Sequence, residues 1–409
     1  MNEIKITPLY RTKINGQHLD EPPITIPITT DLIITPALLL NYYPNMNLSE
    51  LYGCNTFISC DSFASIAIAD FDYFSLISFR DAQVILKYLK IYNAKDFCRF
   101  TGITAERLDI ESSNCCIFDS EIKSINYGIE TNYNSLRGNH SPLIELNKNH
   151  KTVSIQNSKI SDFTIHSYAH SIQLSHVNMN TFTVKENTSI IQVTDFSDVN
   201  NLKLDKTISS LEINNSTVGA IFGSRSLSIK SVSTTHSIIT NVYNIYDLNI
   251  TNHNMDAYEF FRKSYISAND FGNYSKYSFL QKDKIYKEKS KGKDKILLFI
   301  LKHTCGFGYK VSTAIFFSIK VIIGFAVLFT ILTFFGNQNI GLKIEESKNL
   351  LSVILTSFYH SIITFTTLGY GDTLGIDWTT KFLSAAEAIL GIYSMGIIVF
   401  SITNSHITE

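Results

Sequence analysis

The sequence predicts a two-part fold: an α-helical membrane domain near the C-terminus, with two transmembrane helices and a shorter re-entrant helix, preceded by a mainly-β domain. Two long apolar segments in the last hundred residues predict the membrane helices. Short apolar triplets that recur about every 20 residues predict the β domain. Only 17% of the residues are charged, against about 25% in soluble proteins, so part of the chain is expected in apolar surroundings.

The overall charge narrows the classes of partner. The 409 residues carry a formal net charge of -1, whereas a nucleic-acid-binding protein usually has a strong basic excess. We therefore expect no nucleic-acid partner.

The cysteines and the N-terminus indicate a cytosolic, reducing compartment. The six cysteines (54, 60, 98, 115, 116 and 305) show no CxxC spacing and are too sparse for a disulfide framework. We expect them to be inert, packed thiols. The first 17 residues lack the basic and apolar regions of a secretory signal, so the chain is expected to begin in the cytosol.

Residues 1–110 carry no motif that points to chemistry. We expect a small N-terminal capping or interaction domain there. Within it, Ile85, Leu89 and Tyr92 have helical spacing and predict an amphipathic helix over residues 81–92.

Residues 111–255 are predicted to form a repeat domain. Its triplets begin at 153, 172, 191, 211, 227 and 248. Within one repeat, the apolar positions advance by two and then three residues, at Ile172, Leu174, Val177, Met179, Phe182 and Val184. This alternation fits short strands joined by tight corners, stacked as a parallel β-helix. An antiparallel β-sandwich remains an alternative.

Residues 256–312 predict a basic helical linker before the membrane. Ten lysines lie between 276 and 310, against three acidic residues. Lysines beside a membrane segment set its orientation and attract anionic lipid headgroups. The candidate lipid-interface residues are Lys289, Lys291, Lys293, Lys295, Lys302 and Lys310. The apolar stretch 296–309 is expected along the inner membrane face.

Residues 313–409 contain the two predicted membrane crossings. They are Thr313–Phe335, with Lys320 as its one charge, and Trp378–Ile402, with Lys381 and Glu387. At about 1.5 Å per residue, each is long enough to cross the hydrocarbon layer of about 30 Å. Two crossings leave both termini on one side, and the preceding lysines assign that side to the cytosol.

Between the crossings lies a segment that does not need to span the membrane. Residues 350–366 are apolar, and the sequence TLGYGD follows at 367–372. Irregular backbone at membrane depth is tolerated when it is packed in protein or lines a watery path. Because Gly369 and Gly371 can adopt a positive φ, successive carbonyls can point to one side, where four copies replace the hydration shell of a potassium ion.

From Thr313 to Ile402 the sequence resembles the pore of the two-transmembrane potassium-channel family, with TTLGYGD in the place of the selectivity filter. The resemblance implies a homotetrameric, potassium-selective channel that conducts K⁺ passively and is not an enzyme. It also implies that K⁺ is held by Thr367, Leu368, Gly369 and Tyr370, with Gly371 completing the filter. Leu368 replaces the commoner valine, and Tyr370 distinguishes the sequence from nonselective relatives that have aspartate there.

The same resemblance implies how the filter is supported. A pore helix is expected from about Lys348 to Thr366, with Asp372 accepting a hydrogen bond from Tyr359. Some relatives have a second carboxylate on the pore helix where this sequence has Ile363. Glu387 is an intramembrane carboxylate, and we expect it behind the pore helix as a structural partner of the filter.

The second crossing carries the candidate gating residues. Gly391 matches the hinge glycine of the family, and Gly396 follows it by five residues. Two glycines in a helix imply either a gating bend or close packing, and both interpretations stay open. Met395, Val399 and Phe400 are candidates for the cavity wall or an apolar gate.

For the remaining regions the sequence gives expectations of location and regulation. The repeats resemble a degenerate pentapeptide-repeat or related parallel β-helix. We expect the cell (inner) membrane, both termini in the cytoplasm, and gating from the cytoplasmic side by an unknown ligand or protein. No arginine-rich membrane helix, Rossmann fingerprint or metal-ligand spacing around His360 is present in the sequence. A weakly selective cation channel and a membrane-anchored β-helix scaffold are the alternative functions.

Overall fold

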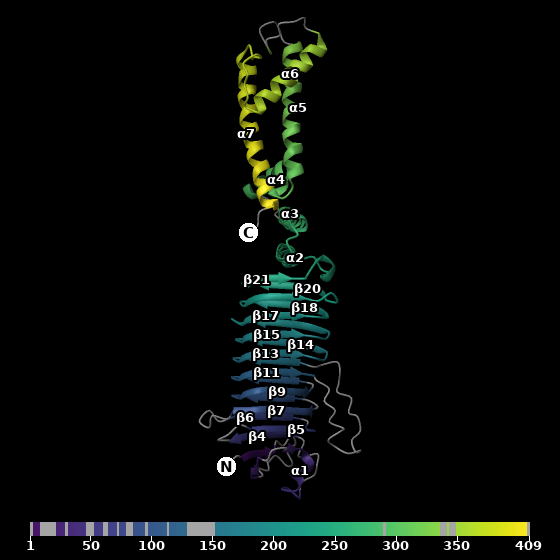
Figure 1. Ribbon diagram of the computed structural model, residues 1–409, viewed down its shortest axis with the longest axis vertical. Helices are drawn as coiled ribbons and strands as arrows, with labels where there is room; N and C mark the ends of the chain where they lie inside the picture. Colours follow the sequence, from purple (N-terminus) through teal and green to yellow (C-terminus); the bar gives the residue numbers. More distant parts are fainter. Residues whose placement is uncertain are drawn as a thin grey trace. The chain divides into compact units, whose positions relative to one another are not determined.

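The computed structural model describes the chain as two compact units, Met1–Ala268 and Asn269–Glu409. The described residues are 3–8, 22–28, 32–45, 53–59, 64–71, 73–78, 85–94, 97–112, 114–128, 152–288, 292–335, 342 and 349–406. Figure 1 labels the elements of both units.

The first unit is built from two long β-sheets whose strands alternate along the chain. One sheet has the order β2-β1-β4-β6-β8-β10-β12-β14-β16-β18-β20, and the other β21-β19-β17-β15-β13-β11-β9-β7-β5-β3. The strands of the first sheet are β1 (Glu3–Pro8), β2 (Ile24–Pro27), β4 (Gly53–Ser59), β6 (Tyr73–Ser78), β8 (Phe97–Thr101), β10 (Asn114–Phe118), β12 (Thr152–Gln156), β14 (Ala169–Ser175), β16 (Thr188–Thr194), β18 (Thr207–Asn214) and β20 (Ser228–Thr235). Those of the second are β3 (Ile33–Ile34), β5 (Ala64–Ala69), β7 (Ile85–Ala94), β9 (Thr104–Ser112), β11 (Glu121–Tyr127), β13 (Lys159–Ile165), β15 (Asn178–Val184), β17 (Asp198–Leu204), β19 (Thr217–Gly223) and β21 (Ile238–Tyr243).

The pairing between successive coils is parallel, so this unit is a parallel β-solenoid (Figure 1). The predicted β-helix is confirmed, and the alternative of an antiparallel sandwich is wrong. Among the described strands, antiparallel pairing joins β1 to β2 and to β4, at the N-terminal end. Each coil places one strand in each sheet, as expected for short strands joined by corners.

Columns of like side chains fill the interior of the solenoid. Ile172 pairs with Ile191 in the next coil, and Phe163 pairs with Phe182, all of them buried. The two phenyl rings stack at a centroid distance of 5.1 Å with 4° between their planes. Because each coil repeats the apolar positions of the last, like side chains stand in register from one coil to the next.

Serine hydroxyls replace missing backbone pairing at one corner of the coils. The Oγ atoms of Ser158, Ser197 and Ser237 each accept a hydrogen bond from a main-chain N–H of the preceding coil, at 3.2 to 3.3 Å. Buried backbone donors need such partners. The residues directly before these serines have positive φ and make the tight turn; they are Asn157, Phe196 and His236.

Two expectations for the N-terminal region are wrong. The predicted helix over residues 81–92 is strand β7 in its described part, with Leu86, Leu89 and Ile91 buried. Coil positions that advance by three and then two residues imitate helical spacing over a short window. Residue 110 is also no boundary of the repeat, since β4 to β9 already belong to the two sheets.

A helix covers the C-terminal end of the solenoid. Helix α2 (Met255–Ser267) buries Phe260 and Phe261, and Ser264 Oγ accepts a hydrogen bond of 3.0 Å from the N–H of Ile245. The β unit therefore extends past the expected boundary at residue 255. Two short helices, α1 (Pro36–Leu40) and the 3₁₀ turn η3 (Asp247–Asn249), complete this unit.

The described cysteines are free thiols, and all but the half-buried Cys116 are packed in the interior, as expected. Cys54, Cys98, Cys115 and Cys305 are buried, and Cys60 lies outside the described residues. Burial raises the pKa of the Cys54 thiol to about 12. A thiol with so high a pKa is a poor nucleophile.

The second unit is helical. It consists of α3 (Phe271–Glu288), α4 (Lys293–Cys305), the 3₁₀ turn η4 (Gly306–Gly308), α5 (Val311–Phe335), α6 (Leu350–Phe365) and α7 (Trp378–His406). Helices α5 and α7 are long and apolar enough to cross a membrane, and α6 is a shorter apolar helix between them in the chain. The two predicted crossings and the re-entrant helix are confirmed as helices, and Lys348 lies outside the described residues.

Candidate functional site

The candidate site begins where α6 ends. The N–H groups of Leu368 and Gly369 both donate to the carbonyl of Ile363, at 2.9 and 3.3 Å. These hydrogen bonds stop the helix and turn the chain into the loop 367–372. The loop is thus held against the last turn of α6 by its own backbone.

The backbone of this loop alternates in handedness. Thr367, Gly369 and Gly371 have φ values of +56°, +52° and +78°, whereas Leu368 and Tyr370 are not among the residues with positive φ. A positive φ suits glycine but costs Thr367 conformational energy, since its side chain is β-branched. Residues that hold such strain tend to cluster at functional sites.

The side chains of the loop are exposed in the single chain. Leu368 is 58% exposed and Tyr370 is 67% exposed. Apolar and aromatic side chains with this exposure form an apolar surface on the loop between the two membrane-length helices.

Tyr359 connects α6 to the far end of the loop. Its hydroxyl donates a hydrogen bond of 2.7 Å to Asp372 Oδ2. The pair implied by the family resemblance therefore lies in direct contact. Ile363, where some relatives have a carboxylate, is buried and apolar.

His360 provides a second connection that the sequence did not indicate. Its Nδ1 lies 2.9 Å from Thr373 Oγ1, and its Nε2 lies 3.0 Å from Ser384 Oγ on α7. Since Ser384 donates its only hydrogen to the Thr380 carbonyl, we infer that Nε2–H donates to Ser384 and that Nδ1 accepts from Thr373. The imidazole thus links α6, the segment that follows Asp372, and α7.

Ser361 provides the third consecutive connection. Its hydroxyl lies 2.8 Å from the carbonyl of Ile322 on α5 and also contacts the Glu387 carboxyl on α7. Glu387 is completely buried. Through hydrogen bonds, residues 359, 360 and 361 together connect α6 to the loop and to both long helices.

The two glycines of α7 have different surroundings. A Cβ atom at Gly391 would lie 2.0 Å from the carbonyl oxygen of Phe365, whereas Gly396 has open space. Met395, Val399 and Phe400 are partly exposed in the single chain. The structure therefore shows a packing requirement at Gly391, and the hinge stays a prediction.

The end of α7 also packs against the turn that precedes α5. A Cβ atom at Gly308 would lie 2.3 Å from Phe400 Cε1 and 3.0 Å from Asn404 Nδ2. In the same turn, the Phe307 ring lies 5.7 Å from the Phe279 ring of α3. Turn η4 therefore joins α3 to the end of α7.

The candidate lipid-interface lysines do not all have the same surroundings. Lys302 forms an ion pair of 2.7 Å with Asp283, which also pairs with Lys287 at 2.8 Å. Burial opposes ionisation of Asp283, but hydrogen bonds from Lys287 and Lys302 outweigh it and lower the pKa of this carboxyl. Lys302 is thus engaged within the protein.

The other interface lysines are placed differently. Lys310 lies over the Phe279 ring at 3.6 Å, Lys293 is exposed, and Lys295 lies 5.9 Å from the Tyr286 ring centre. Lys289 and Lys291 lie outside the described residues.

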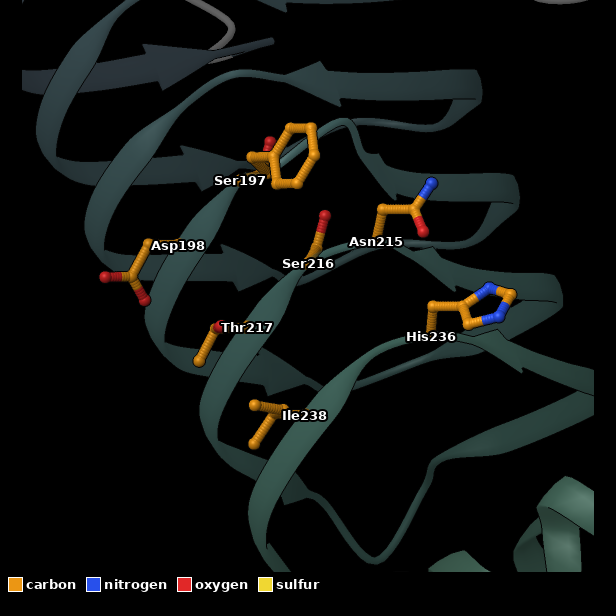
Figure 2. Close-up of a pocket in the computed structure, with 8 residues that line it drawn as sticks. Ser197, Asp198, Asn215, Ser216, Thr217, His236 and Ile238 are labelled. Carbon is orange, nitrogen blue, oxygen red and sulfur yellow. The ribbon is translucent and has the colours of Figure 1, made fainter.

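The solenoid has a surface hollow of its own, of about 640 Å³ (Figure 2). Asp198, Thr217 and Ile238 occupy equivalent positions in successive coils along one edge, while Asn215 and His236 stand at the corners. The hollow mixes polar groups with the exposed side chains of Phe196 and Ile238.

Metal binding by side chains gains no support. The described parts of the chain contain no group of three or more His, Cys, Asp or Glu side chains that could hold a metal ion. The candidate site is the loop 367–372 between α6 and α7, with the side chains that hold it.

Comparison with known proteins agrees with this assignment. Residues 339–406 match the family model described as ion channel, which covers the loop, α6 and α7. Searches of curated proteins and of solved structures give no match. The C-terminal region is an ion channel domain, and the protein is a membrane protein. The match to the ion channel model favours a channel over an enzyme.

Proposed function

With an ion channel domain over residues 339–406, we propose that this protein is a homotetrameric, potassium-selective channel. The observation that carries the proposal is the TLGYG loop, whose backbone has positive φ at every second residue, 367, 369 and 371. A backbone needs this alternation to turn successive carbonyls to one side, and a ring of such carbonyls can replace the hydration shell of K⁺.

Four chains are required to close the ring of carbonyls. In the proposed tetramer, the carbonyls of Thr367, Leu368, Gly369 and Tyr370 and the Thr367 hydroxyl bind the permeant K⁺. The exposed Leu368 and Tyr370 side chains support assembly, because neighbouring subunits would cover them. The C-terminal end of α6 contributes a negative dipole that favours a cation.

Location and orientation follow from charge. We place the protein in the cell (inner) membrane with both termini in the cytoplasm, because lysines precede α5 and favour the cytoplasmic side. Exposed cations near that boundary, such as Lys293, are available to anionic lipid headgroups.

We propose that the β-solenoid regulates opening from the cytoplasmic side. A solenoid transmits displacement well because each coil is fixed to the next. Since α2 packs on β20 and β21, the cut that separates the units is after residue 268, and not after 255. Deletion of residues 1–268 is expected to leave a tetrameric, potassium-selective pore with an altered open probability. Equal flux from equal amounts of both tetramers would remove the regulatory role.

Selectivity is tested by purified protein in liposomes with K⁺ on one side and Na⁺ on the other. The expected reversal potential lies near that of a potassium electrode. The control is Tyr370→Asp, which is expected to admit Na⁺ because it changes the outer part of the filter. Equal permeability of the parent to both ions would identify a weakly selective cation channel. The absence of any flux would favour a membrane-anchored scaffold.

A further inference from the structure

Glu387 occupies an unusual environment for a carboxyl group. It lies in α7 and is completely buried, with Oε1 in hydrogen-bond contact with Ser361 Oγ. Its other oxygen, Oε2, is buried and has no hydrogen-bond partner among the described residues. An ionised carboxylate normally requires several donors or a cation when it is removed from water.

Ser361 has too few hydrogens for the two oxygen atoms that its hydroxyl contacts. A serine hydroxyl has one hydrogen to donate. Ser361 Oγ contacts two acceptors, the Ile322 carbonyl at 2.8 Å and Glu387 Oε1. Both contacts become hydrogen bonds only if the Glu387 carboxyl carries a proton and donates it to Ser361, which in turn donates to Ile322.

The charged groups of the surrounding helices do not compensate an ionised Glu387. Lys320 of α5 and Lys381 of α7 are exposed, and no ion pair joins either to Glu387 in the part of the chain that the structure describes. His360 of α6 has both ring nitrogens engaged, with Thr373 and Ser384. Tyr359 of α6 faces Asp372 instead. A carboxylate at 387 would therefore be buried without a counter-charge.

We propose that Glu387 is a neutral carboxylic acid whose proton is donated to Ser361, so that the chain Glu387–Ser361–Ile322 positions α6 between α7 and α5. The importance of this hydrogen-bonded chain for conduction rests on the proposed channel function, but the existence of the chain does not. Glu387 lies four residues before Gly391, which touches the Phe365 carbonyl. The two contacts hold the pore helix at two points along α7.

The protonation state is tested by infrared spectroscopy of the full-length protein in detergent or lipid at neutral pH. The difference spectrum between the parent and Glu387→Gln is expected to contain the carbonyl band of a protonated carboxylic acid. Exposed carboxyl groups are ionised at this pH and absorb elsewhere. A difference spectrum with a carboxylate band instead would overturn the proposal.

The positioning role is tested by thermal unfolding of the same full-length protein. Glu387→Gln keeps an uncharged hydrogen-bond donor and is expected to stay close to the parent. Glu387→Met keeps the volume but removes the donor, and its thermal midpoint is expected to fall by about 2 to 4 °C. Equal midpoints for the Gln and Met variants would contradict the role.

Ser361→Ala and Ser357→Ala form a matched pair on α6. Both serines are completely buried, but Ser357 Oγ has no hydrogen-bond partner in the described structure, whereas Ser361 Oγ has two. Only Ser361→Ala is expected to lower the thermal midpoint, and equal effects of the two would overturn the proposal. Neither the spectra nor the midpoints depend on flux, so a parent that carries no K⁺ would overturn the channel function and not this inference.

Discussion

Gly391 of α7 lies directly against the main-chain carbonyl of Phe365 at the end of α6. A Cβ atom at residue 391 would lie 2.0 Å from the carbonyl oxygen and 2.9 Å from the carbonyl carbon. The obstacle is backbone, which cannot rotate away as a side chain can. Close approach of the two helices therefore requires glycine at this position.

Gly391→Ala is expected to destabilise the membrane unit by about 1 to 3 kcal/mol, because the added methyl group forces α6 and α7 apart. The matched control is Gly396→Ala, which introduces the same methyl group in the same helix where there is open space. Thermal unfolding of the two variants measures the difference. If Gly391 instead serves only as a hinge, both variants will unfold like the parent, while recordings of Gly391→Ala show a reduced open probability at unchanged conductance.

Tyr359→Phe is expected to weaken the support of the filter without changing the fold. The substitution removes the hydroxyl that donates to Asp372 Oδ2 at 2.7 Å and leaves the ring in place. Potassium flux in liposomes should then decline faster during sustained activity than flux through the parent. Tyr393→Phe removes a hydroxyl from α7 that makes no hydrogen bond among the described residues, so it serves as the control. Equal decline in all three proteins would mean that the Tyr359–Asp372 contact does not support the filter.

The β-solenoid could be predicted from sequence because its interior positions repeat from coil to coil. The pattern was clear at Ile172 and Leu174, where the polar corners separate the strands cleanly. It was hidden near Leu86, Leu89 and Ile91, because steps of three and two residues resemble helical spacing when only one coil is inspected. Comparing several coils in register would have identified β7 as a strand.

The site was predictable where the chemistry lies in a local motif and hidden where it depends on distant contacts. The TLGYG motif is recognisable in the sequence, since its glycines permit the positive φ values that the loop needs. His360 and Ser361 were missed because their partners lie 13 to 39 residues away in the sequence. Polar residues in the apolar segment 350–365 were the available signal, since a buried polar group needs a partner.

Asp109→Asn is expected to destabilise the solenoid by about 1 to 3 kcal/mol at neutral pH. Burial alone would raise the pKa of Asp109, but hydrogen bonds from Arg107, Tyr88 and Asn126 outweigh burial and lower it. A carboxyl whose pKa is lowered by folding stabilises the folded state fully above its unfolded pKa, about 3.9. This contribution is lost as the pH falls through the folded pKa.

The parent and Asp109→Asn should therefore differ in stability at pH 7 and converge in strong acid. Circular dichroism during thermal unfolding follows the β unit at each pH. Glu106→Gln is the control, because it neutralises an exposed carboxyl on the same strand. A difference between parent and Asp109→Asn that stays constant from pH 7 to below pH 3 would show that the ionised carboxyl is not the stabilising group.

Gly308→Ala is expected to change channel opening, because turn η4 packs against the end of the inner helix. Its new methyl group would meet Phe400 at 2.3 Å, and Phe400 lies near the cytoplasmic end of α7 in the proposed orientation. The substitution also strains the backbone, since φ at Gly308 is +82°. Gly292→Ala separates the two effects, because φ there is +118° but no atom of the described residues lies within 4 Å of the added Cβ.

Single-channel recordings should therefore show an altered open probability for Gly308→Ala and a parental value for Gly292→Ala. Shortening the obstructing side chain supplies a further test. In the double variant Gly308→Ala/Phe400→Ala, the space left by the ring accepts the methyl group, so the open probability should move back toward that of Phe400→Ala alone. Independent, additive effects of the two substitutions would show that the turn and the helix end are not coupled. Coupling would identify η4 as the element through which a displacement of α3 reaches the inner helix, since Phe307 of the same turn packs on Phe279.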